Sequence, residues 1–513
     1  MEMQTSRTNV LLRGPAIVAY VALFNLLLHF YFGRYYGYQR DELYFIACGR
    51  HLAWGYVDVG PLTMWLGSLG HVLFGETLFG FRFFSFVAGA GTVLLTGLIA
   101  RELGGGRYAQ FLAALCVVVA PVWMIANNVL ALPSFEPIFW AGCALLLIRV
   151  LKTGNSKLWL WFGVVAGIGL LNKFSMAFFG VATVIGLLLT PHRKQLLNKW
   201  LWIGGLIALA IVAPGLWWQF EKDWPTLQFI IGMNRGVMAR IPRLVFVLGQ
   251  VVYQNPATLP VWLAGLWFLL FSQAGKPYRI FGWVYAIIFL FMFIVKSKIY
   301  YLSPAYPMML GAGAVAIADA FSKPGHMWAR VAAVGVLVAG GAVMAPLGLP
   351  ILPIDKLDGY VGTVTGGMLK NVYELTGTYH DQFGWKNQAE SVAKVYHSLP
   401  PEDQASCMII AGNFGQAGAI DFYGPALGLP PVTAGHQNYF FWARPEEDKR
   451  VAVAFGVDME DPEMFFSDIQ EAAVITCSEA VPSEQHVPVY VCREPKASLR
   501  EVWPSLRALA FRN

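Results

Sequence analysis

Hydrophobic and polar positions divide the chain into a long apolar part and a shorter alternating part. Up to about residue 350, apolar runs alternate with short polar segments, and many runs approach the roughly 20 residues that a transmembrane helix needs. We predict helices at residues 14–33, 79–100, 108–126, 135–151, 158–171, 174–190, 200–220, 256–272, 280–295, 302–321 and 328–349. The pattern therefore predicts about eleven transmembrane helices.

Composition supports a polytopic α-helical membrane protein. Hydrophobic residues make up 57% of the 513 residues and charged residues 13%, whereas soluble domains usually hold about 25% charged residues. Residues 1–350 contain 25 Lys+Arg and 10 Asp+Glu, but residues 351–513 contain 12 and 21. We therefore expect a basic transmembrane domain at 1–350 and an acidic soluble domain at 351–513.

The positions of Lys and Arg predict the orientation. Short loops on one side of the predicted bundle collect them, as cytoplasmic loops do. The N-terminus is therefore expected in the cytoplasm, with residues 34–78, 127–134, 221–255, 296–301 and everything after 350 on the outer face. The first span lacks a small-residue cleavage site and ends in Phe30, Tyr31 and Phe32, which favours an uncleaved helix over a signal peptide.

Two adjacent acids, Asp41 and Glu42, follow the first span directly. A carboxylate at the lipid boundary is costly unless it is solvated, paired or used, so both are candidate site residues. The alternative is a helix N-terminus, where acids are favoured. Residues 43–54 and 62–74 read as two interfacial helices separated by a turn at 55–61, and this arrangement holds the two acids and Asp58 above the bundle.

Several outer loops are basic against the topology rule. Arg235, Arg240, Arg243, Lys296 and Lys298 fall on the predicted outer face. Snorkelling or interfacial anchoring is one explanation. Because the cations gather on the side that carries the acids, we favour the other, an anionic ligand on that face.

The tail reads as a small α/β domain. Residues 406–411, 450–455, 473–476 and 488–492 are predicted strands, and 392–399 and 417–423 are predicted helices. The loop at 412–418 follows a strand and opens a helix, which suits an anion or a sugar hydroxyl, but a plain tight turn explains it equally well. The six cysteines lack metal-ligand spacing, and a Cys477–Cys492 pair across adjacent strands is an open alternative.

Together these pieces resemble the GT-C membrane glycosyltransferases that use polyprenyl-phosphate sugars. The chain is most similar to the bacterial branch with the aminoarabinose transferase of lipid A and to the protein O-mannosyltransferases. The resemblance covers nearly the whole chain. It is carried by Asp41-Glu42, Gly55-Tyr56-Val57-Asp58-Val59-Gly60-Pro61-Leu62, Leu170-Leu171-Asn172-Lys173 and Lys296-Ser-Lys-Ile-Tyr-Tyr301. It implies the GT-C fold with interfacial helices in the first outer loop.

The resemblance also implies roles for individual residues. Asp41 takes the place of the general base, and Glu42 would assist or orient it. Lys173, Arg235 and Tyr301 match the family's phosphate-binding residues by context. Snorkelling is the alternative for Lys173 and aromatic packing for Tyr301. The remaining candidate substrate-binding residues are Arg40, Asp58, Glu136, Lys296 and Lys298, of which Arg40 has the alternative of pairing with Asp41.

The chain departs from the aminoarabinose branch at two positions. The turn lysine that meets lipid phosphate in that branch is absent, because Val59, Gly60 and Pro61 stand there. The Asp-Pro after the third span is represented only by Glu136, offset by two residues, which either replaces that aspartate or caps a helix. Both departures bear on which donor is bound.

The sequence therefore predicts an inverting glycosyltransferase that moves a sugar from an undecaprenyl-type phosphate to a lipid, glycan or protein on the outer face of the cytoplasmic membrane. We expect no cofactor, metal site or nucleic-acid partner, and keep a divalent cation as an alternative. Membrane lipids are the surrounding partners. Two other function classes stay open: a transporter or flippase, although the charges gather at the surface and not at the midplane, and a non-catalytic binder of lipid-linked sugars.

Overall fold

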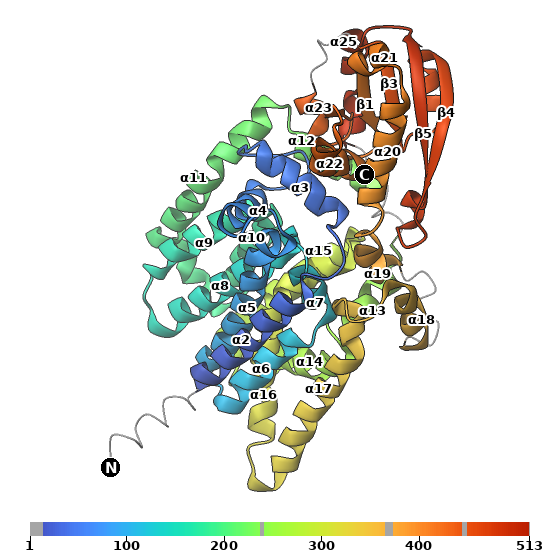
Figure 1. Cartoon of the computed structure of the whole chain (residues 1–513). Helices are drawn as coiled ribbons and strands as arrows, with labels where there is room; N and C mark the ends of the chain where they lie inside the picture. The colour runs from blue at the N-terminus through green and yellow to red at the C-terminus, as the bar shows by residue number, and fades with distance from the viewer. Residues whose placement is uncertain (1–13, 236–240, 365–372, 444–448, 512–513) are drawn as a thin grey trace.

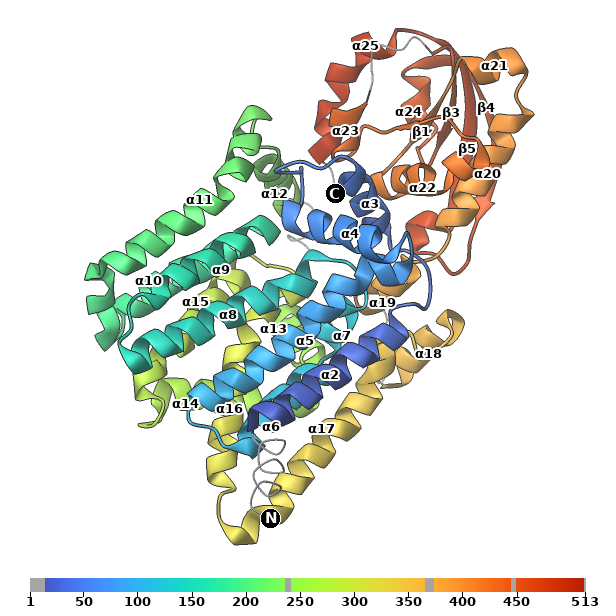
Figure 2. The same ribbon diagram turned by 60° about the vertical axis from the view of Figure 1, so that its left-hand side comes forward.

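The protein consists of a helical bundle with an α/β domain seated on one end (Figures 1 and 2). The computed structural model describes residues 14–235, 241–364, 373–443 and 449–511. The first described helix begins at the end of the bundle that lies away from the α/β domain (Figure 1).

Seven helical stretches in the described residues are long and apolar enough to cross a membrane, or nine if two bent pairs are counted. The seven are α2 (Gly14–Phe32), α5 (Leu78–Glu102), α8 (Leu132–Thr153), α11 (Lys199–Glu221), η4 (Lys276–Tyr278) with α15 (Arg279–Ile294), η5 (Ile299–Ala305) with α16 (Tyr306–Ala320), and η6 (Pro324–His326) with α17 (Met327–Gly348). The bent pairs are α6 (Arg107–Val118) with α7 (Pro121–Asn127) and α10 (Met176–Leu188) with η1 (Pro191–Leu197).

Two of the predicted spans form apolar helices that are shorter than the membrane-crossing helices above. These are α9 (Leu158–Asn172) and α14 (Leu259–Phe271), the latter preceded by η3 (Pro256–Thr258). Each of the eleven predicted spans thus coincides with a helix or a bent pair, but the number that crosses the membrane stays a prediction.

One predicted span is broken. Residues 108–126 were expected as one helix, but α6 and α7 meet at an angle of 63°. Pro121 occupies the first position of α7, and proline ends a helix because it lacks the N–H and its ring clashes with the preceding turn. After the kink, α7 packs against α17, α5 and α8.

Glycines let several helices approach closely. A Cβ on Gly313 of α16 would lie 1.8 Å from the carbonyl oxygen of Val261 in α14, and one on Gly265 would lie 1.9 Å from that of Met309. In lipid there is little hydrophobic force between helices, so backbone contact of this kind supplies the packing.

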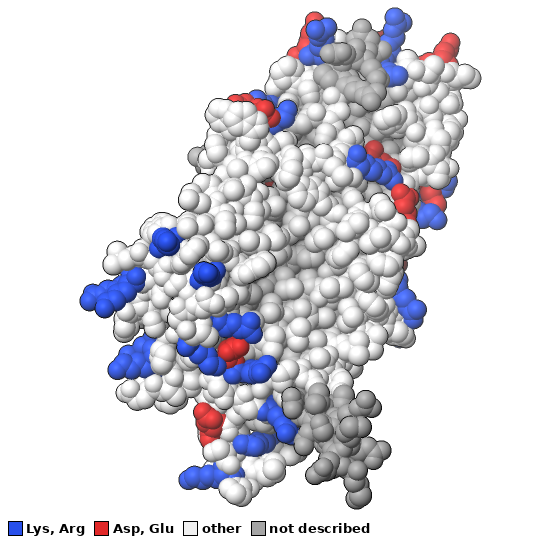
Figure 3. Space-filling view, turned by 90° about the vertical axis from the view of Figure 1, so that its left-hand side faces the viewer, with Lys and Arg blue, Asp and Glu red and all other residues white. Residues whose placement is uncertain are grey.

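Charged side chains are absent from a broad band on the face of the bundle shown in Figure 3. Lys and Arg gather at the end of the bundle away from the α/β domain, where the short loops after α5, α8 and α10 lie. This apolar band with a basic rim fits a multi-pass membrane protein.

The α/β domain is built on a five-stranded sheet with order β2-β1-β3-β5-β4. The strands are β1 (Cys407–Ala411), β2 (Val432–Thr433), β3 (Val451–Phe455), β4 (Phe466–Thr476) and β5 (His486–Pro495). Strands β2, β1 and β3 are parallel, whereas β5 runs antiparallel to β3 and β4. The four predicted strands are present, although β4 is longer than expected, and β2 was missed because it has two residues.

Helices cover both faces of the sheet. The helices of this part are α18 (Ile354–Val364), α19 (Tyr373–His380), α20 (Trp385–Ser398), α21 (Pro401–Ala405), α22 (Phe414–Tyr423), η7 (Pro425–Leu427), α23 (Tyr439–Trp442), α24 (Glu460–Glu463), η8 (Pro482–Glu484), α25 (Leu499–Val502) and η9 (Trp503–Phe511). One face of β1 and β3 packs on α20 and α22, and the other packs toward α24, α25 and η9.

The end of the bundle that carries the α/β domain holds four further helices, α3 (Arg40–Arg50), α4 (Pro61–Phe74), α12 (Pro225–Arg235) and α13 (Arg243–Tyr253). Helix α3 lies between α4 and α22 (Figure 2), and its residues 42–48 are buried. Apolar side chains of α3, α22 and the sheet form one continuous core. Because that core is shared, the α/β domain is fixed relative to α3.

Candidate active site

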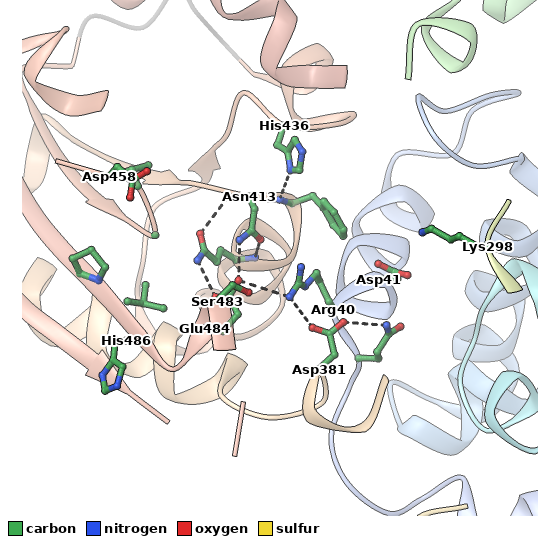
Figure 4. Close-up of a pocket in the computed structure, with 17 residues that line it drawn as sticks. Arg40, Asp41, Lys298, Asp381, Asn413, His436, Asp458, Ser483, Glu484 and His486 are labelled. Atoms are coloured by element: carbon green, nitrogen blue, oxygen red, sulfur yellow. Dashed lines mark hydrogen bonds and ion pairs between the residues drawn. The ribbon is translucent and has the colours of Figure 1, made fainter. Parts of the chain in front are cut away.

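A polar cavity of about 590 Å³ lies where the membrane part meets the α/β domain. Gln39, Arg40 and Asp41 at the start of α3 and Lys298 before η5 line one side (Figure 4). The remaining lining residues come from the tail: Asp381, Asn413, Phe414, Gln416, His436, residues 456–458, Ser483, Glu484 and residues 486–488. The cavity volume falls in the range of ligand pockets, about 300–1,000 Å³.

Asp41 lies in the first turn of α3 and faces this cavity (Figure 4). The N-cap of α3 is Gln39, so Asp41 is not the capping residue, although both acids lie in the first turn of the helix, as the N-terminus alternative expects, and Glu42 completes a capping box with Gln39. Burial raises the pKa of Asp41, and the cations of Arg40 and Lys298 oppose that rise. A carboxylate with a raised pKa beside a cation suits a general base, because it binds a proton more readily than a solvated carboxylate does.

Glu42 points the other way, into a fully buried ion pair with Arg82 of α5. Its two oxygens accept from Arg82 Nε at 2.7 Å and Nη2 at 2.6 Å. They also accept from the backbone N–H groups of Leu130 at 2.7 Å and Gln39 at 2.9 Å. With all four bonds made inside the protein, this geometry orients α3 and leaves the cavity to Asp41. A role of Glu42 in catalysis beyond orienting Asp41 stays a prediction.

Asp58 lies beside Asp41 on the turn between α3 and α4. It accepts a hydrogen bond of 3.1 Å from the Tyr44 hydroxyl. Burial and the charge of Asp41 raise its pKa to about 7. The two carboxylates therefore influence each other, as acid and base groups of a shared site do.

Three further predicted residues come together at the ends of α8 and α9. Lys173 Nζ lies 3.0 Å from Glu136 Oε2 and 4.0 Å from the ring centroid of Tyr301. The Ser175 hydroxyl also donates to Glu136. Glu136 lies inside α8, whose N-cap is Ala131, so it pairs with Lys173 instead of capping the helix. The neighbouring Tyr300 is within electrostatic reach of both Asp41 and Glu136, which links this cluster to the catalytic candidate.

Arg40 pairs with carboxylates of the α/β domain. Its Nη2 lies 2.9 Å from Asp381 Oδ1 and 3.9 Å from Glu484 Oε1, and its guanidinium lies over Trp385. The alternative that Arg40 forms its ion pair with Asp41 is therefore wrong. A role of Arg40 in substrate binding stays a prediction, and the observed role is to join α3 to the tail.

The other predicted cations lie apart. Lys296 occupies the turn between α15 and η5 with φ 55°, and it is not among the residues that line the described cavity. Arg235 ends α12, and its side chain lies outside the described part, as does Arg240. Arg243 opens α13 and lies over Phe293.

The missing turn lysine has a structural explanation. A Cβ on Gly60 would lie 2.2 Å from the carbonyl oxygen of Leu171 and 2.5 Å from that of Asn172. A lysine at this position would force the turn away from the end of α9. The close approach instead brings Lys173, the residue that follows α9, near the turn.

Backbone N–H groups of the loop at 412–418 are hydrogen-bonded to side chains of the protein. Asn413 Oδ1 accepts from the N–H groups of Gly415 and Gln416, and Gln416 Oε1 accepts from those of Gly412 and Asn413. The Phe414 N–H meets His436 Nδ1 at 3.2 Å. Because these five amides are already paired, the anion-binding alternative for this loop is wrong, while its side chains still line the cavity.

The cysteine alternative is also wrong. In the β4–β5 ladder Cys492 stands opposite Ile469, whereas Cys477 follows the far end of β4. Both cysteines are free. Within the described ranges no group of three or more His, Cys, Asp or Glu side chains is arranged to hold a metal ion.

Sequence reasoning missed Arg82 and the tail residues of the cavity. An arginine inside an apolar helix is a recognisable signal, so Arg82 could have been found. Asp381, His436, Asp458 and His486 carried no such signal, because only the docking of the α/β domain brings them to Asp41.

Comparison with known proteins supports the resemblance. Residues 58–218 match the family model for dolichyl-phosphate-mannose-protein mannosyltransferase, so the match begins after Asp41. An uncharacterized protein of Aquifex aeolicus is 28% identical over 258 residues, which are 48% of this chain and 51% of that protein. The undecaprenyl phosphate-alpha-4-amino-4-deoxy-L-arabinose arabinosyl transferase of Pseudomonas paraeruginosa is 30% identical over 158 residues, 29% of this chain and 28% of that protein. The matched regions thus span about half or less of these relatives.

Solved structures match over nearly the whole chain. ArnT from Cupriavidus metallidurans, in a crystal structure bound to undecaprenyl phosphate, has a TM-score of 0.63 at 15% identity and covers 93% of this chain and 97% of that one. The arabinofuranosyltransferase AftD from Mycobacteria has a TM-score of 0.51 at 15% identity and covers 94% of this chain and 40% of that one. The chain therefore has the fold of these membrane glycosyltransferases, the GT-C fold, and its residues 58–218 are similar to the protein mannosyltransferase family.

Proposed function

We propose that the protein transfers a sugar from a polyprenyl phosphate, of the undecaprenyl type, to a hydroxyl-bearing acceptor at the outer face of the cytoplasmic membrane. The observation that carries the proposal is the polar cavity, in which Asp41 and Lys298 lie together at the junction of the bundle and the α/β domain. The relatives support the donor class: the matched Pseudomonas enzyme is an undecaprenyl phosphate sugar transferase, and ArnT binds undecaprenyl phosphate.

In the proposed step, the acceptor oxygen attacks the anomeric carbon of the donor sugar. A bond forms between that oxygen and carbon, and the bond between the carbon and the phosphate oxygen breaks. The acceptor proton goes to the Asp41 carboxylate, and the polyprenyl phosphate leaves with the electron pair. Attack from the face opposite the leaving phosphate inverts the anomeric configuration.

The leaving phosphate requires cations, because charge develops on it as the bond breaks. Lys298 shares the cavity with Asp41, and Lys173 lies at the nearby end of α9 with Tyr301 against it. We assign the donor phosphate to these two lysines in place of the absent turn lysine. Glu136, bonded to Lys173 at 3.0 Å, would hold that lysine in position.

The proposed orientation follows the basic rim. Lys and Arg gather on the rim away from the α/β domain, which by the positive-inside rule places that rim in the cytoplasm. The α/β domain and the cavity would then face the periplasm or the cell exterior. Sugar transfer would accordingly take place outside the cytoplasmic membrane.

The test is transfer from a panel of radiolabelled polyprenyl-phosphate sugars by the purified full chain in detergent, with native membrane lipid extract as acceptor. Asp41→Asn should abolish labelled product without changing thermal stability. Asp468→Asn, at an exposed position on β4, is the matched control and should retain full activity. Product formation by Asp41→Asn at the normal rate would contradict the proposal.

A further inference from the structure

The α/β domain has an open crevice at the carboxyl ends of its parallel strands. Strand β1 leads into α22 on one face of the sheet, and the neighbouring β3 leads through residues 456–458 to α24 on the other face. In open α/β sheets, ligands bind where the loops after adjacent parallel strands diverge to opposite faces. The crevice between β1 and β3 is such a position.

The polar cavity opens at this same crevice. Asn413, Phe414 and Gln416 come from the loop and helix after β1, and Gly456, Val457 and Asp458 come from the loop after β3. Figure 4 shows Asp41 and Lys298 on one side of the pocket and Asp458 and His486 on the other. The cavity therefore connects the crevice of the α/β domain with the catalytic candidate.

The two sides of the cavity differ in charge. The membrane part contributes Lys298 beside Asp41, whereas the tail contributes three acids, Asp381, Asp458 and Glu484. Arg40 neutralises one of them through its ion pair with Asp381. A phosphate or carboxylate on the tail side would meet net negative charge, so the tail side disfavours an anionic ligand.

The tail side offers groups that suit a sugar ring. Asp458, Ser483 and His486 are solvent-exposed at the mouth and supply hydrogen-bond donors and acceptors for hydroxyl groups. Phe414, whose ring lies 5.3 Å from that of His436, adds an apolar surface to the cavity wall. The backbone amides of the β1–α22 loop are already paired, so recognition here falls to side chains.

We propose that this crevice binds the uncharged, hydroxylated glycan portion of the acceptor and presents one of its hydroxyl groups to Asp41. This inference rests on the proposed glycosyl transfer and names its acceptor class. The acceptor enters from the solvent side, past Asp458 and His486, while the donor phosphate is held on the membrane side by Lys298. Residues of the α/β domain that line the cavity thus determine which acceptor is bound.

The first test measures binding without turnover. Saturation-transfer NMR is recorded on the full chain in detergent with neutral trisaccharides of glucose, mannose or galactose as probes, and with inorganic phosphate as competitor. The double variant Asp458→Asn/His486→Ala should weaken binding of the recognised trisaccharide about tenfold, which corresponds to about 1.4 kcal/mol. Asp468→Asn, exposed on β4, should bind as the wild type does, and phosphate should not displace the sugar.

The Asp41→Asn variant separates this inference from the proposed function. It should keep trisaccharide binding even though transfer is lost. If the wild-type protein binds a trisaccharide through Asp458 and His486 but shows no transfer activity, the glycan site stands and the proposed glycosyltransferase function is refuted. Absence of binding by every trisaccharide, equal binding by the double variant, or displacement by phosphate would overturn the glycan site.

A second arm distinguishes the acceptor from the donor sugar, which shares the same chemistry. In the transfer assay, the double variant should raise the KM for the acceptor extract about tenfold and leave the KM for the polyprenyl-phosphate sugar unchanged. A rise confined to the donor KM would assign the crevice to the donor sugar and overturn the proposal.

Discussion

The buried pair of Glu42 and Arg82 allows a sharp prediction about how Asp41 is held. Both side chains are almost fully buried, with exposed fractions of 0% and 1%. Besides Glu42, Arg82 donates to the carbonyl oxygens of Gly33 and Gly37, each at 2.8 Å. The pair therefore ties the end of α2, the start of α3 and α5 together. Glu42→Ala should loosen the base of α3 and with it the position of Asp41.

Glu42→Ala should lower the free energy of unfolding strongly, because four hydrogen bonds end on the Glu42 carboxylate. Removing Glu42 leaves the Arg82 charge without its counter-ion in a buried site, which costs about 3–5 kcal/mol. The N–H groups of Leu130 and Gln39 also lose their acceptor, and each such buried group costs about 1–3 kcal/mol. We therefore expect Glu42→Ala to lower the free energy of unfolding by about 5 kcal/mol, the upper end of the range for an unpaired buried charge.

Glu102 provides a matched control. It makes ion pairs with Arg149 and Lys152, both at 3.1 Å, but those partners are 43% and 45% exposed. Exposed pairs contribute about 0–1 kcal/mol, so Glu102→Ala should change stability little. The contrast isolates burial, because both variants remove a glutamate that makes ion pairs at the end of a helix.

The assay is a denaturing-detergent titration of the purified protein followed by far-UV circular dichroism. The double variant Glu42→Gln/Arg82→Gln should lose less stability than the sum of its single variants, because no buried charge is left unpaired. Equal stabilities for Glu42→Ala and Glu102→Ala would refute the reasoning. Stable Glu42→Ala protein without transfer activity would point to a direct catalytic role for Glu42.

Three further predictions concern the charges around the cavity. The acid limb of the pH–rate profile should lie at a higher pH than an ordinary carboxyl group would give, because burial raises the pKa of Asp41. Lys298→Met removes a cation that lowers this pKa, so the acid limb should move to still higher pH. Lys173→Met should weaken donor binding by about tenfold, measured as the inhibition constant of undecaprenyl phosphate. The pKa of Asp381 is raised from 3.8 to about 7 by burial, against the effect of Arg40. The folded chain therefore holds its proton to higher pH than the unfolded chain, and its contribution to stability falls as pH rises through that window. Asp381→Asn should remove this decline, so that the free energy of unfolding changes less with pH between about 4 and 7.

Each of these has a contrary result. An acid limb that does not move in Lys298→Met would mean that this lysine does not act on Asp41. Unchanged inhibition in Lys173→Met would remove that lysine from the donor site. A stability profile that keeps its slope in Asp381→Asn would assign the titration to another group.

The sequence by itself determined the class of the protein and the first catalytic candidate. Apolar runs near the length of a bilayer span and basic loops identify a polytopic membrane protein without any tertiary information, because both follow from the solvent that each segment meets. The acids after the first span stood out for the same reason. Local pattern also located four of the five strands of the tail.

Tertiary structure decided which acid faces the cavity. Asp41 and Glu42 are neighbours in sequence, but the turn of α3 directs one into the cavity and the other onto Arg82. The break at Pro121 depended on local backbone chemistry that an apolar pattern does not register. Likewise, Glu136 and Lys173 became partners only when α8 and α9 packed side by side.

The cavity itself belongs entirely to the tertiary structure. Its walls come from the start of α3, the turn before η5 and five separate segments of the tail, so residues more than 400 positions apart in sequence share one site. No periodicity records such distant contacts, because hydrophobic patterns report which face of an element is buried and not what covers it. The shared core of α3 and α22 is what brings the α/β domain over Asp41.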